Sequence, residues 1–232
     1  MPRPHLYLLA ALLAALGISQ VSDRIDPYHL DVLTGIGINI ILAVSLNLVN
    51  GFTGQFSLGH AGFMSVGAYA AAAFSLFLGP QLLGSAGGTP FQQGCLFFGA
   101  LLTGGFFASL AGLLVGVPSL RLKGDYLALV TLGFGEIIRV IIQNVEFLGG
   151  ALGLNGIPPY TTIFWVLAFV ALSVFVVSCL VNSTYGRGFL ATHDDEIASE
   201  AVGLNTTHYK IVAFVIGAFF AGTAGGLYGH FK

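Results

Sequence analysis

Long apolar runs recur along the chain, and they constrain its fold more than any other feature. A membrane-spanning helix needs about 20 largely apolar residues. Seven windows approximately meet this requirement: 6–22, 31–49, 58–79, 94–117, 126–145, 161–181 and 211–231. The segments between them are polar or rich in glycine and proline. We therefore predict an all-α fold, a single-domain polytopic membrane helix bundle with about seven transmembrane helices.

The composition excludes several other classes of protein. Only 8% of the residues are charged and 56% are hydrophobic, whereas a soluble domain has about 25% charged residues. The 33 glycines and long apolar runs favour packed helices over an outer-membrane barrel, whose strands would alternate polar and apolar residues. A net charge of −2 gives no basic face for nucleic acid. The sequence has no GxxxxGK[ST], HExxH or paired CxxC motif, so we expect no ATP-binding loop and no metal site of these kinds in this chain.

Two local features are open to more than one interpretation. The apolar N-terminal run could be a signal peptide, but no clear small-x-small cleavage site precedes Asp23 and further apolar segments follow, so we interpret it as the first span. Cys95 and Cys179 both lie in apolar runs. We predict small buried side chains there rather than a disulfide or a metal pair.

The basic residues predict the orientation in the membrane, because Lys and Arg are retained on the cytoplasmic side. With a cytoplasmic N-terminus and seven crossings, only Arg24 lies in an outer loop, and five basic residues lie inside: Arg3, Arg121, Lys123, Arg187 and Lys210. The polar loop 183–210 is then cytoplasmic. Asp194, Asp195 and Glu196 are typical of a helix N-terminus and Gly203 of its end, so we expect a short helix that either docks on a partner or merely connects two spans.

The segment TLGFGEIIRVIIQN predicts a polar helix face within the membrane. Glu136, Arg139 and Gln143 are spaced i, i+3, i+7 and share one side of a helix. Because a charge near the bilayer centre costs about 2.5 to 3.5 kcal/mol, we expect this face to point into the bundle or a wet cavity, with the two charges partly neutralising each other. The face could serve a solute pathway or gate, or be an internal ion pair that fixes helix rotation. Elsewhere, glycine pairs predict close helix crossings, namely Gly112 with Gly116 and Gly222 with Gly226.

The stretch GFTGQFSLGHAGFMSVGAY, residues 51–69, is unusually polar and glycine-rich for a membrane segment. Each glycine costs about 1 kcal/mol relative to alanine in a helix interior. The pattern predicts either a bent or broken backbone near 51–59, as transporters use, or a close-packed turn between helices. The side chains of Gln55, Ser57 and His60 could then hydrogen-bond freed backbone groups. With Gly59 and Gly62, and with Glu136 and Arg139, they are our predicted solute-pathway or gating residues.

Several blocks together resemble one transporter family. These are NIILAVSLNLVNGFTGQFSLGHAGFMSVGAYAAA, GDYLALVTLGFGEIIRVIIQN, LGLNGIPP, YGRGFLATHDDEIASEAVGLNTTHYKIVAF and AFFAGTAGGLYGHF. In this order they resemble the permeases of branched-chain amino acid ABC importers, in the subtype that carries the TLGFGEIIR and LNGIPP blocks. The resemblance covers most of residues 31–231, and urea-type permeases are similar.

The resemblance implies a permease subunit of an ATP-driven importer that moves branched-chain or related amino acids across the bacterial inner membrane by alternating access. The chain would then be a transport subunit without a cofactor of its own, and not an enzyme. The implied partners are a second permease, two cytoplasmic ATPases that bind ATP, and a periplasmic solute-binding protein. The loop 183–210 would be the coupling segment that docks on an ATPase, with Asp195, Glu196, Glu200 and Gly203 at positions matching the family's loop. The alternatives are a urea or amide permease, a stand-alone secondary transporter or channel, and a purely structural membrane subunit.

The chain departs from the family pattern at three places. Glu196 precedes Gly203 by seven residues, where the general ABC-importer loop has six. His193 stands where the resemblance leads us to expect an arginine. The family usually continues with further spans after a run such as GTAGGLYGHF, so we expect a truncated product or a fragment, which puts independent transport in question.

Overall fold

The computed structural model of the chain describes residues 4–21, 26–83, 89–120, 122 and 125–231. Within these residues every regular element is helical, which confirms the predicted fold class. Six helical segments are long and apolar enough to cross a membrane: Pro27–Phe52, His60–Leu82, Pro90–Ser119, Tyr126–Asn144, Ile163–Val181 and Thr206–Gly229. The first predicted window coincides with a seventh helix, whose apolar part Leu8–Gln20 is shorter.

The elements follow one another with short connections. They are α1 (Pro4–Val21), α2 (Pro27–Asn47), the π-helical turn η2 (Leu48–Phe52), α3 (His60–Leu83), α4 (Pro90–Ser119), α5 (Asp125–Asn144), the 3₁₀ turns η3 (Glu146–Leu148) and η4 (Gly150–Leu152), α6 (Ile163–Val181), α7 (Thr184–Asp194), α8 (Glu196–Ala201) and α9 (Thr206–Gly229).

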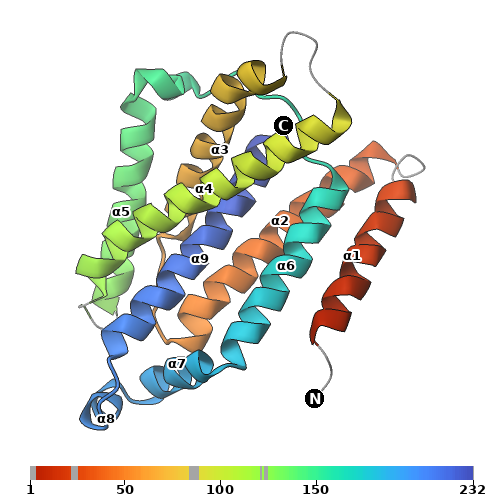
Figure 1. Cartoon of the computed structure of the whole chain (residues 1–232). Helices are drawn as coiled ribbons and strands as arrows, with labels where there is room; N and C mark the ends of the chain where they lie inside the picture. Colours follow the sequence, from red (N-terminus) through yellow and green to blue (C-terminus); the bar gives the residue numbers. More distant parts are fainter. Residues whose placement is uncertain (1–3, 22–25, 84–88, 121, 123–124, 232) are drawn as a thin grey trace.

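Successive long helices run in alternating directions through the bundle (Figure 1). Helix α1 begins at the end of the bundle where α7 and α8 lie, and α9 finishes at the opposite end. Arg187 lies in α7 and Lys210 in the first turns of α9, both at the α7–α8 end. This agrees with the predicted grouping of the cytoplasmic basic residues. The other basic residues used for that prediction lie outside the described residues: Arg3, Arg24, Arg121 and Lys123.

Helices α2, α4 and α9 begin about one turn before their predicted windows, because polar caps start them. The side chain of Asp26 accepts from Tyr28 N, and Pro27 occupies the first turn of α2. Thr89 and Gln92 form a capping box at the start of α4. Asn205 accepts from His208 N at the start of α9. Such caps stabilise a helix start but lower the local hydropathy, so an apolar window misses them.

The centre of the bundle is a crossing of α3, α4 and α9, with α9 the most buried of the long helices. A Cβ atom added to Gly67 would overlap the backbone of Gly222, and one added to Gly104 would lie 2.7 Å from the Gly67 carbonyl oxygen. The predicted glycine pairs serve the same purpose. A Cβ at Gly112 would lie 2.6 Å from Ala218 Cβ, and one at Gly226 would lie 2.9 Å from a methyl of Leu101. Small residues therefore let these backbones approach closely.

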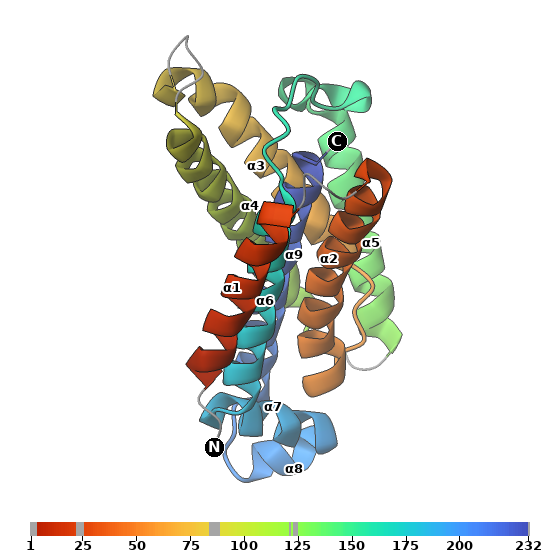
Figure 2. The same ribbon diagram turned by 90° about the vertical axis from the view of Figure 1, so that its right-hand side faces the viewer.

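Two helices are peripheral. Helix α1 packs mainly against α6, beside which it lies in Figure 2, and α5 packs mainly against α3. The cysteine prediction is wrong in one respect. Both thiols are free, but Cys95 is exposed and Cys179 is only partly buried. They lie on faces of α4 and α6 that the rest of this chain does not cover, and an apolar sequence run does not reveal which faces those are.

Candidate functional site

The helix that begins with α2 is broken between Phe52 and His60. It ends in η2, a π-helical turn, and residues 53–59 are non-helical before α3 starts. Along this segment the side chains alternate between the interior and the surface. Thr53, Gln55, Ser57 and Gly59 are buried, whereas Gly54, Phe56 and Leu58 are exposed. The segment therefore presents one polar edge to the interior of the bundle.

Side chains from two helices hold the broken backbone. The hydroxyl of Thr53 donates to the carbonyl of Val49 over 2.7 Å. The backbone N–H of Ser57 donates to Asn50 Oδ1 over 3.2 Å, and that of Leu58 donates to Thr131 Oγ1 of α5 over 3.1 Å. Non-helical backbone at membrane depth is tolerated where protein groups satisfy it. These contacts satisfy part of the hydrogen-bonding groups in the broken backbone.

The start of α3 is also closely packed, so the broken helix and the close contact coexist. A Cβ at Gly59 would lie 2.6 Å from the carbonyl oxygen of Thr131, and one at Gly62 would lie 3.0 Å from the Cα of Gly135. Nε2 of His60 hydrogen-bonds to Oγ of Ser45 over 2.8 Å. The two interpretations of the glycines are therefore not exclusive: the break comes first, and α3 then crosses α5 at close range.

Gln55 and Ser57 are the least satisfied polar residues of this segment. Each is 3% exposed. Among the described residues, Nε2 and Oε1 of Gln55 and Oγ of Ser57 have no hydrogen-bond partner. A buried polar group without a partner costs about 1 to 3 kcal/mol, so native structures contain few of them. This conformation therefore holds donors and acceptors that are free to bind another group.

The polar face of α5 lies elsewhere. Arg139 Nε donates to Glu136 Oε2 over 2.9 Å, so the expected mutual neutralisation is present. However, the Arg139 and Glu136 side chains are 63% and 59% exposed, and Gln143 is exposed too. Of the two predicted surroundings, the interior of the chain's own bundle is therefore wrong, and a wet cavity stays a prediction. Helix α5 packs on α3 through a neighbouring side, where Gly135 and Ile138 lie against Gly62.

The loop 183–210 folds into two helices rather than one. Asp195 caps α8, since its Oδ1 accepts from Ile197 N over 2.9 Å and from Ala198 N over 3.0 Å. Gly203 follows the helix with a φ of +88°, a conformation that favours glycine. The prediction of a short helix over 194–203 is confirmed by α8 (Glu196–Ala201), but Asp194 ends α7, a helix that the sequence did not predict.

Two of the predicted coupling residues contact the start of α9. Glu196 Oε1 lies 2.7 Å from Lys210 Nζ, and the hydroxyl of Thr206 donates to Glu200 Oε1 over 2.7 Å. The Glu196 side chain is 22% exposed, whereas Glu200 lies on the exposed surface. That surface also carries two large apolar side chains: Ile197 is 73% exposed and Val202, just after the helix, is 78% exposed.

The structure brings the broken segment 53–59 together with α7, which the sequence did not predict. A Cβ at Gly54 would lie 2.8 Å from Cδ2 of His193 in α7. Sequence reasoning also gave no role in the break to three polar residues: Ser45, Asn50 and Thr131. In the sequence, these three positions stand out only as polar residues within apolar runs. Lys210 was assigned only an orientation role.

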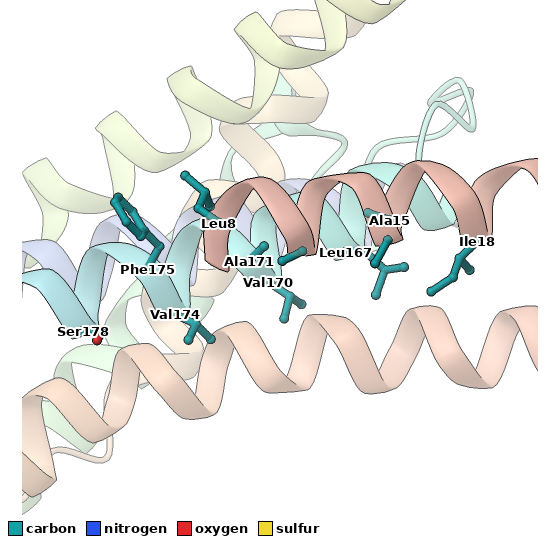
Figure 3. Close-up of a pocket in the computed structure, with 11 residues that line it drawn as sticks. Leu8, Ala15, Ile18, Leu167, Val170, Ala171, Val174, Phe175 and Ser178 are labelled. Carbon is teal, nitrogen blue, oxygen red and sulfur yellow. The ribbon is translucent and has the colours of Figure 1, made fainter. Parts of the chain in front are cut away.

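A cavity of about 540 Å³ lies between α1 and α6, away from this polar cluster. Figure 3 shows side chains of both helices around it, including Leu8, Val170 and Phe175. Its lining is apolar apart from Ser178, so it has too few polar groups to orient a charged or zwitterionic solute.

A bundle of apolar helices, one of which is broken at a buried polar cluster, defines a polytopic membrane protein with an internal polar site. A family model described as the permease component of branched-chain amino acid transport systems matches residues 28–231. The chain therefore belongs to this family of permease components.

Curated relatives give the same result. The chain is 35% identical over 261 aligned residues to the high-affinity branched-chain amino acid transport system permease protein LivM of Salmonella typhimurium, and equally to that of Escherichia coli. These alignments cover 97% of this chain and 57% of each relative, so the chain spans little more than half of their length. A probable LivM of Methanocaldococcus jannaschii is 27% identical over 85% of this chain and 66% of its own. No solved structure matches the chain.

Proposed function

We propose that the chain is a permease subunit of an ATP-driven importer for branched-chain or related amino acids and works by alternating access. The observation that carries the proposal is the break at 53–59, with the buried, unpartnered Gln55 and Ser57. Broken helices with free polar groups are how membrane transporters build solute sites. The polar groups of this cluster, including Ser45, His60 and Thr131, come from three spans.

The proposed assembly contains a second permease, two cytoplasmic ATPases that bind ATP, and a periplasmic solute-binding protein, in the inner membrane with the N-terminus of this chain in the cytoplasm. The exposed Glu136–Arg139 pair supports a second subunit, because charges at membrane depth need cover from protein or water. The exposed Ile197 and Val202 support a protein partner at the α7–α8 end.

Reconstitution in liposomes tests the function. With the ATPases, the second permease and the binding protein present, we expect ATP-dependent uptake of a labelled branched-chain amino acid and little uptake of labelled urea. Uptake by this chain alone under an ion gradient would instead identify a secondary transporter. Preferential urea uptake by the full assembly would identify a urea permease.

We expect Ile197→Asp combined with Val202→Asp to weaken ATPase docking at least about tenfold, because docking would bury two apolar side chains that each contribute about 1.5 kcal/mol or more. Co-purification of the ATPase with the permease measures the effect. Leu152→Asp is the matched control, since Leu152 is 89% exposed at the opposite end of the bundle. Equal co-purification for both variants would place the docking surface elsewhere. Glu196→Lys is a poorer test, because it would set a second cation beside Lys210.

The α5 face has its own test. We expect Glu136→Gln alone to lower the amount of assembled permease more than Glu136→Gln with Arg139→Gln, because the single change leaves one unpaired charge at a cost of up to about 3 kcal/mol. Assembly is measured by size-exclusion chromatography and transport by uptake. If the double variant assembles normally and takes up solute normally, the pair has only a structural role. Reduced uptake with normal assembly would place it in the pathway.

A further inference from the structure

We infer that His193 of α7 transmits movement of the cytoplasmic helices α7 and α8 to residues 53–59, the broken segment that carries Gln55 and Ser57. This inference rests on the proposed function, because it takes an ATPase partner as the source of the movement. The contact between Gly54 and His193 joins the segment that would meet the partner to the segment that would meet the solute.

The contact is tight and depends on glycine. Gly54 has a φ of +68°, and a Cβ there would lie 2.8 Å from His193 Cδ2 and 3.5 Å from its Cα. The imidazole of His193 therefore lies directly against the backbone of the broken segment. The ring also contacts Asp194, whose Oδ1 lies 3.3 Å from Nδ1. That carboxylate is 79% exposed. The ring of His193 therefore has the exposed Asp194 carboxylate on one side and the backbone of Gly54 on the other.

Packing joins α7 to the break over a wider area. Phe189, fully buried in α7, shares an apolar cluster with Leu48 of η2, Val177 of α6 and Ala213 of α9. A displacement of α7 therefore acts on the helical side of the break through Phe189 and on its non-helical side through His193. Helix α8 is tied separately to α9 by the Lys210–Glu196 pair. Movement at α8 can thus reach the bundle by two routes, and the α7 route reaches residues 53–59 directly through His193.

The free energy of the broken segment favours a second arrangement of residues 53–59. Gln55 and Ser57 are buried without hydrogen-bond partners in the described part of the chain, which disfavours the present conformation. The backbone there is held by side chains such as Asn50 and Thr131 and not by a helical ladder, so few backbone bonds have to break. A small displacement that hydrates Gln55 and Ser57, or brings solute to them, offsets their present desolvation.

Alanine substitutions in the assembled transporter test the relay. Gly54→Ala adds a methyl against His193, His193→Ala removes the ring, and the double variant exchanges one for the other. Gly156→Ala is the matched control, because Gly156 has a φ of +80° but nothing within 4 Å of an added Cβ. It reproduces the backbone strain without the contact. The readouts are ATP hydrolysis, solute uptake and hydrogen exchange of residues 53–59 with and without a trapped nucleotide.

We expect Gly54→Ala and His193→Ala each to lower uptake per ATP hydrolysed by roughly fivefold to tenfold, and the double variant to recover part of this loss, since residues in contact are not additive. The nucleotide-dependent change in exchange at 53–59 should shrink in both single variants, and Gly156→Ala should match wild type. Unchanged uptake per ATP in His193→Ala would overturn the relay, even if Gly54→Ala failed to fold. If the wild-type assembly nevertheless couples uptake to ATP hydrolysis, the relay is wrong and the proposed function is still supported. A wild-type assembly that does not couple them would overturn both.

Discussion

Gly67→Ala is expected to remove most of the folded permease from the membrane. Gly67 lies where α3 meets α9, and an added Cβ would overlap the Cα and carbonyl of Gly222. The carbonyl of Gly67 also lies under Gly104 of α4. The obstacle is backbone on both sides, which cannot change rotamer, so the three central helices would have to move apart. Overpacking costs typically 1 to 3 kcal/mol, and we expect about 3 kcal/mol or more here.

The measurement is the yield of folded protein and its Tm in detergent. Gly35→Ala provides a matched control, because Gly35 lies inside α2 and has nothing within 4 Å of an added Cβ. There the methyl should improve helix propensity by up to about 1 kcal/mol. If the two alanine variants have the same Tm, the close crossing does not determine stability and the glycines of α3 have another role.

Lys210→Met is expected to release α8 from α9. The ammonium of Lys210 lies 2.7 Å from Glu196 Oε1, and the two side chains are 9% and 22% exposed. Removing one partner of a fully buried pair costs about 3 to 5 kcal/mol. Because Glu196 keeps some contact with water, we expect about 2 kcal/mol, which makes opening of α8 roughly 30 times more frequent. Hydrogen exchange of residues 196–201 measures this opening.

A double-mutant cycle with Glu196→Gln separates the pair from other effects of the substitution. Glu196→Gln alone should also raise exchange in α8, because it leaves the buried ammonium of Lys210 unpaired. The double variant should fall between wild type and the single variants. If exchange in α8 stays at the wild-type level in all three, the α8–α9 junction is held by the Thr206–Glu200 hydrogen bond and by packing.

Local patterns in the sequence were sufficient for several features. Hydropathy located the long helices, and the i, i+3 spacing of Glu136 and Arg139 predicted their ion pair. Asp195 and Gly203 marked the limits of α8, because a cap and a left-handed glycine act within a few residues. Each of these rests on interactions between near neighbours in the chain, which a sequence records directly.

Other predictions failed because they concerned the direction in which a side chain points. The face of Glu136 and Arg139 proved to lie outside the bundle. Cys95 proved exposed. In an apolar chain nearly every helix face is hydrophobic, so the sequence gives little contrast between a face that meets another helix and a face that meets lipid.

By itself the sequence determined that this protein is a bundle of membrane helices, with a glycine-rich polar segment at 51–69 and a short helix capped by Asp195 and ending before Gly203. Only the tertiary structure decided that the segment is both broken and closely packed, that Gln55 and Ser57 lie buried without partners, and that Gly54 lies against His193. The physical reason is distance along the chain. Caps, turns and hydropathy act over a few residues, whereas these contacts join residues far apart in sequence, whose meeting depends on how the helices cross.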